Sequence, residues 1–272
     1  MSRWILFDLG NTLIRSPPYE YRRKEKLNYL RNIFEQLTFR NLIKTCTLNN
    51  FEFAEKVLQD KNDAVLLEET CIQVIRDHSE SVDTYLLEVL KELLNNPEAI
   101  DCTGYMMWTD ELSILSSIQA AGYSLCLIAN SSHPAKIRKI LQDSKEGSAS
   151  LLEFLSKVYI TSELGLAKPD PALMNSILSD LSTSKDNVVV VGDSLDIDIF
   201  WAQECGIKSV WLNLSPTHKH KNIEYINDRK VNYPRSTMSL NLLVETIQYY
   251  EPRGLRVGYF LPTSKKRILI AR

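Results

Sequence analysis

The chain of 272 residues contains 44% hydrophobic and 24% charged residues and has a net charge of −2, which is typical of a globular protein with one large domain or a domain plus an insertion. This charge gives no global attraction for nucleic acid or an anionic membrane, and we expect neither partner. The five cysteines are scattered and lack Cys-x-x-Cys spacing, which argues against a disulfide framework and a zinc site. No signal peptide or membrane-spanning run is recognisable, so a cytoplasmic location is expected.

The first predicted element is a buried strand at Trp4–Asp8. Its apolar residues deliver one carboxylate, Asp8, into a Gly-Asn-Thr turn. A strand that ends in this way is typical of the mouth of an α/β site, where loop residues take over from core residues. Asp8 is therefore a candidate functional residue.

The next segment, Arg15–Asp101, has few strand signals and strong helical periodicity. Pro17-Pro18 marks the exit from the first strand loop, and Asn95-Asn96-Pro97 breaks the last helix. One helical face carries Leu27, Leu30, Ile33, Phe34 and Leu37. We predict an inserted all-helical domain over residues 15–101.

From residue 102 onward, strand and helix candidates alternate. Continuous apolar strands separated by helices indicate a parallel sheet covered on both faces. The predicted fold class is therefore α/β, with a doubly wound parallel sheet formed by residues 1–14 and 102–250. In chain order the expected elements are a strand at Ser124–Ala129, a helix at His133–Gln142, a strand at Lys157–Thr161, a helix at Pro169–Leu181, a strand at Val188–Val191, a helix at Asp196–Glu204 and a strand at Ser209–Asn213.

The pattern weakens after Asn213. Leu240–Tyr250 has the character of a helix that returns to the core. The basic C-terminal extension, residues 251–272, holds two apolar-basic runs around Thr-Ser-Lys-Lys, which suggest a hairpin. Its charges are interpreted as a solvated strand face rather than as a binding surface for an acidic partner or nucleic acid.

Four segments in chain order carry a family resemblance. They are WILFDLGNTL (residues 4–13), YSLCLIANSS (123–132), GLAKPDP (165–171) and VVVVGDSLDID (188–198). Together they resemble the four motifs of the haloacid dehalogenase (HAD) superfamily, over residues 4–213. The resemblance implies a HAD/Rossmann-like core. It also implies that the helical insertion is a cap that closes over the site, although a purely structural bundle remains an alternative.

The resemblance implies roles for five positions. Asp8 corresponds to the nucleophile, and Lys168 to the lysine that neutralises the nucleophile and the phosphate. Asp193 and Asp198 correspond to the acids that hold Mg²⁺ together with Asp8, and carboxylates plus substrate oxygens suit this cation. Gly10 stands where the family has a second Asp, which binds the metal through its backbone carbonyl and transfers a proton through its side chain. The metal ligand is therefore retained, whereas the general acid/base is lost.

The predicted phosphate-binding positions are Asn130, Ser131 and Thr12. The family places Ser or Thr at the end of its second strand, but Ala129 stands there. Ser131 or Ser132 can replace the missing hydroxyl if the loop is shifted, and Asn130 can donate through its amide.

Two further polar residues lie beside these motifs. His133 precedes a helix and can in principle act as an acid/base, but we interpret it as a helix-entry residue that faces solvent. Asp196 is interpreted as a helix-start residue rather than a metal ligand.

Three functions are compatible with this set. The leading one is Mg²⁺-dependent hydrolysis of small phosphate esters through an aspartyl-phosphate, with a small phosphorylated metabolite as substrate. A haloacid dehalogenase also uses an Asp nucleophile without the second Asp, but it needs no metal, and the intact GDSLDID segment argues against it. The third is a non-catalytic HAD-like protein that binds a phosphate ligand or a protein partner. The sequence does not predict an oligomeric state.

Overall fold

The computed structural model describes residues 3–44, 49–59, 67–77, 81–107, 111–212, 225–226, 229–230 and 235–237. Its centre is a six-stranded parallel sheet with the order β12-β9-β8-β1-β4-β7. The strands are β1 (Arg3–Phe7), β4 (Tyr123–Ala129), β7 (Lys157–Ile160), β8 (Val188–Gly192), β9 (Lys208–Leu212) and β12 (Arg235–Thr237). β1 lies between β8 and β4, so the chain crosses to opposite sides of its first strand, as at the switch point of a doubly wound sheet.

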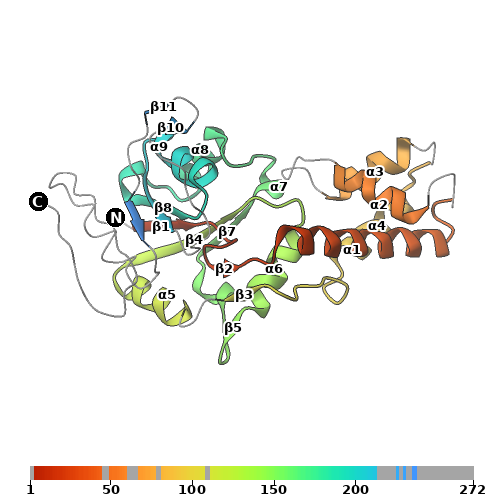
Figure 1. The fold of residues 1–272 in the computed structure, drawn as a ribbon, viewed down its shortest axis with the longest axis horizontal. Helices are drawn as coiled ribbons and strands as arrows, with labels where there is room; N and C mark the ends of the chain where they lie inside the picture. The colour runs from red at the N-terminus through yellow and green to blue at the C-terminus, as the bar shows by residue number, and fades with distance from the viewer. Residues whose placement is uncertain are drawn as a thin grey trace, which may run out of the picture.

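Helices cover both faces of this sheet (Figure 1). Ile5 and Phe7 point to the face packed by α5 (Glu111–Ala120) and α6 (Pro134–Asp143). Leu6, between them, joins the opposite cluster with α8 (Pro171–Asp180) and α9 (Trp201–Glu204). This alternation confirms the predicted doubly wound α/β fold class, because successive strand residues point to opposite faces.

A separate group of helices occupies one end of the molecule (Figure 1, right). Its members are α1 (Tyr19–Phe39), α2 (Asn50–Gln59), α3 (Leu67–Asp77) and α4 (Thr84–Asn95). They share a hydrophobic cluster that contains no residue of the sheet. The predicted apolar face is confirmed, since Leu27, Leu30, Ile33, Phe34 and Leu37 are all buried in it.

Two short strands stand at the base of this helical group. β2 (Ile14–Arg15) pairs antiparallel with β3 (Met106–Met107), so the segments that enter and leave the helices lie side by side. As predicted, α1 starts directly after Pro18, and α4 ends at Asn95.

Several boundaries differ from the prediction. The helix predicted from Pro169 begins at Pro171, because the Asp170 side chain accepts a hydrogen bond from the Ala172 amide and caps it. The helix predicted over Asp196–Glu204 is instead a π-helical turn, η3 (Leu195–Phe200), followed by α9. The remaining elements are β5 (Lys145–Glu146), β6 (Ala149–Ser150), η1 (Leu151–Phe154), α7 (Thr161–Leu164), η2 (Lys185–Asn187), β10 (Tyr225–Ile226) and β11 (Arg229–Lys230).

Other predictions concern the C-terminus, the cysteines and the membrane. The helix predicted at 240–250 and the hairpin at 251–272 lie outside the described residues. The four cysteines within the described ranges are free, and Cys126 and Cys205 are buried. None of the helices that the structure describes is long and apolar enough to cross a membrane.

Candidate active site

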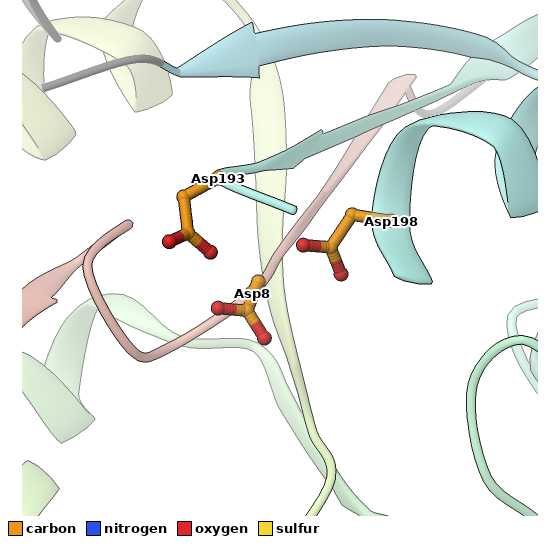
Figure 2. Close-up of side chains that lie close together, drawn as sticks. All are labelled: Asp8, Asp193 and Asp198. Atoms are coloured by element: carbon orange, nitrogen blue, oxygen red, sulfur yellow. The ribbon is translucent and has the colours of Figure 1, made fainter. Parts of the chain in front are cut away.

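Three carboxylates converge at the carboxyl edge of the sheet. Asp8 follows β1, Asp193 follows the neighbouring strand β8, and Asp198 lies in η3. One oxygen from each lies within 4.8 Å of the others, and Figure 2 shows the side chains pointing toward one another. The Asp8 amide donates to the carbonyl of Val191 at 2.9 Å, which extends the β1–β8 pairing to the site.

Lys168 joins two of these carboxylates. Its buried Nζ lies 2.7 Å from an oxygen of Asp8 and 2.7 Å from an oxygen of Asp198. Burial opposes the charge on the ammonium group, but the two carboxylates outweigh it and raise the pKa of Lys168 above its ordinary value. Lys168 is therefore cationic and fixed beside Asp8.

Negative charge is nonetheless in excess. Burial, reinforced by Asp8 and Asp198, raises the pKa of Asp193 to about 7. Burial also raises the pKa of Asp198, against the opposing effect of Lys168. Three carboxylates thus face one ammonium group, and the cluster has the electrostatic character of a cation site.

The sequence Gly-Asp-Ser positions Asp198 closely against the end of β8. A Cβ atom on Gly192 would lie 2.4 Å from Asp198 Cγ, so only glycine leaves room for this carboxylate. The Ser194 amide donates to Asp198 Oδ2 at 3.1 Å. Trp211 Nε1 donates to the carbonyl of Asp193 at 2.9 Å, which ties the loop to β9.

Gly10 lies in the tight turn that follows Asp8. Asn11, the next residue, has a positive φ of 57°, a backbone region that asparagine tolerates. A Cβ on Gly10 would lie 2.9 Å from Ser16 Oγ. The serine hydroxyl therefore occupies the space that a side chain at position 10 would enter.

The predicted phosphate-binding residues are found in different environments. Asn130 uses its amide in both directions with the Lys168 main chain, since Nδ2 donates to the carbonyl at 2.9 Å and Oδ1 accepts from the amide at 3.0 Å. Ser131 Oγ accepts from the His133 amide at 3.1 Å. Thr12 is fully buried, and among the described residues its hydroxyl has no hydrogen-bond partner. Asn130 thus positions the segment that carries Lys168.

The prediction that His133 faces solvent is wrong. The residue is 9% exposed, and its ring stacks on Tyr29 of α1, with ring centroids 5.1 Å apart. Its Nε2 lies 3.0 Å from the carbonyl of Leu94 at the end of α4. Burial lowers the pKa of His133 to about 4. The residue therefore joins the helical group to the sheet domain as a neutral ring.

A cleft that the sequence analysis did not predict lies beside this junction. Its volume is about 350 Å³, and residues of α1, the 130–133 loop and α6 line it. Lys26 Nζ crosses it to donate to Ser132 Oγ at 3.2 Å. The feature of the sequence that could have indicated this cleft is the basic pair Arg22-Arg23 followed by Lys26, which lies one helical turn after Arg22.

The chain resembles known proteins in sequence and in fold. The chain is 28% identical over 109 residues to a phosphoserine phosphatase of Thermus thermophilus, a match that spans 40% of this chain and only 41% of that relative. A crystal structure of a 2-haloacid dehalogenase from Pseudomonas syringae has a TM-score of 0.61 at 18% identity and covers 92% of this chain and 100% of its own. A HAD family enzyme from Bacteroides thetaiotaomicron, in complex with magnesium and inorganic phosphate, has a TM-score of 0.50 at 16% identity and covers 81% of this chain and 98% of its own.

The two structures show the shared fold. A family model of haloacid dehalogenase-like hydrolases matches residues 5–212, which contain the three carboxylates and Lys168. The chain therefore belongs to the haloacid dehalogenase-like hydrolase family.

Proposed function

We propose that the protein is a Mg²⁺-dependent hydrolase of small phosphate esters, with Asp8 as its nucleophile. The observation that carries this proposal is the buried Lys168 ammonium, 2.7 Å from both Asp8 and Asp198, within a cluster of three carboxylates. A nucleophile beside a fixed cation and a cation-binding set are the parts that phosphoryl transfer requires.

The residues present fit Mg²⁺. The donor set is all oxygen, consisting of Asp8, Asp193 and Asp198 with the backbone carbonyl of Gly10 as the proposed fourth ligand. Burial, reinforced by the charges of Asp8 and Asp198, raises the pKa of Asp193, so a bound cation would stabilise the charged form of this carboxylate. When bound, the metal would neutralise charge on the phosphate oxygens.

The chain's own residues account for two chemical steps. The Asp8 carboxylate attacks phosphorus, the bond to the ester oxygen breaks, and the alcohol leaves as an alkoxide while an aspartyl-phosphate forms. Water then attacks the same phosphorus, which releases phosphate and restores the Asp8 carboxylate. Lys168 neutralises the Asp8 carboxylate and the transferring group, and Asn130 holds the main chain of Lys168 in place.

Gly10 leaves both steps without a side chain for proton transfer. Positioned proton transfer typically contributes about 10²–10⁴-fold, so its loss slows the reaction without abolishing it. The proposed substrates are therefore esters whose leaving oxygen needs no proton, such as anomeric or acyl phosphates.

We also propose that the helical group acts as a cap over this site. It is inserted between Asp8 and Asn130, and it contacts the loop that follows β4 through Lys26 and Tyr29. Such a domain excludes water and contacts the substrate.

A non-catalytic phosphate-binding protein is the second candidate. Two observations favour it. Ala129 offers no hydroxyl, and both functional ends of the Asn130 amide are engaged with the Lys168 main chain. A dehalogenase remains the less favoured enzyme, because three clustered acids suit a metal that it does not need.

The test is hydrolysis of p-nitrophenyl phosphate by the purified protein with Mg²⁺ and with EDTA. We expect turnover with Mg²⁺ only, and its loss in Asp8→Asn. Asp196→Asn is the matched control, because Asp196 is an exposed acid of η3 outside the cluster. Equal turnover by Asp8→Asn and the parent would show that Asp8 is not the nucleophile. No turnover by the parent would favour the non-catalytic candidate.

A further inference from the structure

The cleft lined by α1, the 130–133 loop and α6 lies between the helical group and the sheet domain. It has a volume of about 350 Å³, which is the size of a small-molecule site. Asn130 and Ser131 form part of its wall. Asn130 is bonded to the main chain of Lys168, and the Lys168 side chain is bonded to Asp8, so these two residues link the wall of the cleft to the proposed phosphoryl site.

Positive charge predominates in this cleft. Four cationic side chains line it, against the two carboxylates of Glu25 and Asp101. Two of the cations have carboxylate neighbours: Arg23 lies 2.8 Å from Glu55, and Lys136 lies 3.8 Å from Glu25. Arg22 and Lys26, which also line the cleft, stand one turn apart on α1.

Arg22 and Lys26 are placed differently within the cleft. Within the part of the chain that the structure describes, Arg22 has no carboxylate within ion-pair distance, and its guanidinium lies 6.0 Å from the centroid of the Tyr19 ring. Lys26 is held toward the sheet domain by its hydrogen bond to Ser132 Oγ. A guanidinium and an ammonium group on one wall form a suitable site for an anion.

When the phosphoryl group of a substrate is bound at Asp8, the organic part of that substrate would lie in this cleft. A neutral alcohol would make no use of the exposed Arg22 guanidinium, whereas an anionic group could bind both Arg22 and Lys26. We propose that the substrate carries a second anionic group, a carboxylate or another phosphate, which Arg22 and Lys26 bind. This inference rests on the proposed phosphatase function. It narrows the proposed substrates to compact phosphorylated compounds that carry a second anionic group.

Two matched pairs of substrates test this inference. Glucuronate 1-phosphate and glucose 1-phosphate differ by a carboxylate in place of a hydroxymethyl group, and ribose 1,5-bisphosphate and ribose 1-phosphate differ by a second phosphate. All four compounds carry a phosphate on the anomeric oxygen. We expect the parent to prefer the more anionic member of one pair, in kcat/KM, by about 10- to 100-fold, the effect of a hydrogen bond to a charged group. The preferred pair identifies the anion.

Charge-removing variants locate the effect. Arg22→Gln should remove most of this preference by raising KM for the anionic member more than for the neutral member. Lys26→Gln should reduce the preference in the same way, in addition to the effect of losing its hydrogen bond to Ser132. Lys24→Gln is the matched control, because Lys24 is an exposed lysine of α1 that does not line the cleft. The inference is overturned if the parent does not discriminate within either pair, or if Arg22→Gln keeps the full preference.

Calorimetry separates this inference from the proposed function. Absence of turnover on every ester would remove the phosphatase function but would still allow binding of the same four compounds to be measured. Tighter binding of one anionic member by the parent than by Arg22→Gln would support the cleft as an anion site. Equal binding of all four compounds would overturn it.

Discussion

The space around Gly10 determines whether an acidic side chain can be introduced there as a general acid/base. A side chain there begins 2.9 Å from Ser16 Oγ, so the serine must rotate away. Ser16 is a small side chain next to the turn, and this movement is a local one. An acidic side chain can therefore be accommodated at position 10 if the Ser16 side chain moves.

We predict that Gly10→Asp raises turnover of alkyl phosphates by up to about 10²–10⁴-fold, because their alkoxide leaving group needs a proton. The increase should be larger when Ser16→Ala is added, since this opens the space. Gly10→Asn controls for size without the acid. Equal rates for Gly10→Asp and Gly10→Asn, in steady-state assays of folded protein, would contradict this role for position 10.

A second prediction at this scale concerns Gly192. A methyl group there would collide with Asp198 and displace it from Lys168. Gly192→Ala should therefore abolish the rise in Tm that Mg²⁺ produces in the parent. The same substitution in an Asp198→Asn background should change the Mg²⁺ response little, because the affected carboxylate is already absent. A full Mg²⁺-dependent rise in the single variant would argue against this close approach.

Among the elements, the junction between α1, α4 and the start of α6 has a specific pH dependence. His133 is buried there, with a folded-state pKa of about 4, whereas an exposed histidine has a pKa of about 6.5. The unfolded chain therefore takes up the proton first as the pH falls. The stability that this neutral ring contributes is present above pH 6.5 and is lost toward pH 4.

We predict that His133→Gln lowers the unfolding free energy at pH 7.5, because the contacts with Tyr29 and Leu94 are weakened. The deficit should shrink as the pH approaches 4, by at most about 3.5 kcal/mol at ~1.4 kcal/mol per pKa unit. Urea unfolding of parent and variant at several pH values measures this difference. A deficit that is the same at pH 7.5 and pH 5 would contradict a buried neutral His133.

The strands that carry the acids could be predicted from the sequence, whereas the burial of His133 at this junction could not. The strands at Trp4–Asp8 and Val188–Val191 were identified because continuous apolar runs ended at Asp-containing turns, and the carboxyl ends of parallel strands meet at one edge. The convergence of the three acids followed from that geometry. His133 could not be predicted in this way, because its burial depends on Tyr29 and Leu94, which are distant in the sequence.

The cleft and the π-helical turn could not be predicted from the sequence either, because both depend on tertiary contacts or on specific hydrogen bonds. The cleft that contains Arg22 and Lys26 forms only where α1 lies against the loop after β4. Helical periodicity identified the buried face of α1 but did not show what its polar face approaches. The π-helical turn at Asp198 likewise depends on hydrogen bonds to Ser194 rather than on composition.

For the whole molecule, a closing cap predicts movement at its two connections. β2 and β3 hold these connections together, next to Pro17-Pro18 on one side. Fluoroberyllate with Mg²⁺, an analogue of the phosphoryl group, should slow amide hydrogen exchange in residues 12–18 and 95–107. Asp8→Asn should abolish that protection. Unchanged exchange, despite a rise in Tm that shows binding, would argue for a rigid helical domain.

The proposed two-step reaction on Asp8 has a consequence that can be measured on the intact chain. Without an acid/base, attack of water on the aspartyl-phosphate is slower than in an enzyme that has one. With an activated aryl phosphate, whose leaving group departs without a proton, the second step limits turnover. The phosphorylated protein should then accumulate.

The most direct measurement is an acid quench of the protein during turnover of p-nitrophenyl phosphate, followed by mass spectrometry of its peptides. We predict one phosphoryl group on the peptide that contains Asp8, formed with Mg²⁺, absent with EDTA and absent in Asp8→Asn. Less of it should remain in Gly10→Asp, where the second step is restored. Sustained Mg²⁺-dependent turnover by the parent with no phosphoryl group on Asp8 at any time point would contradict the account.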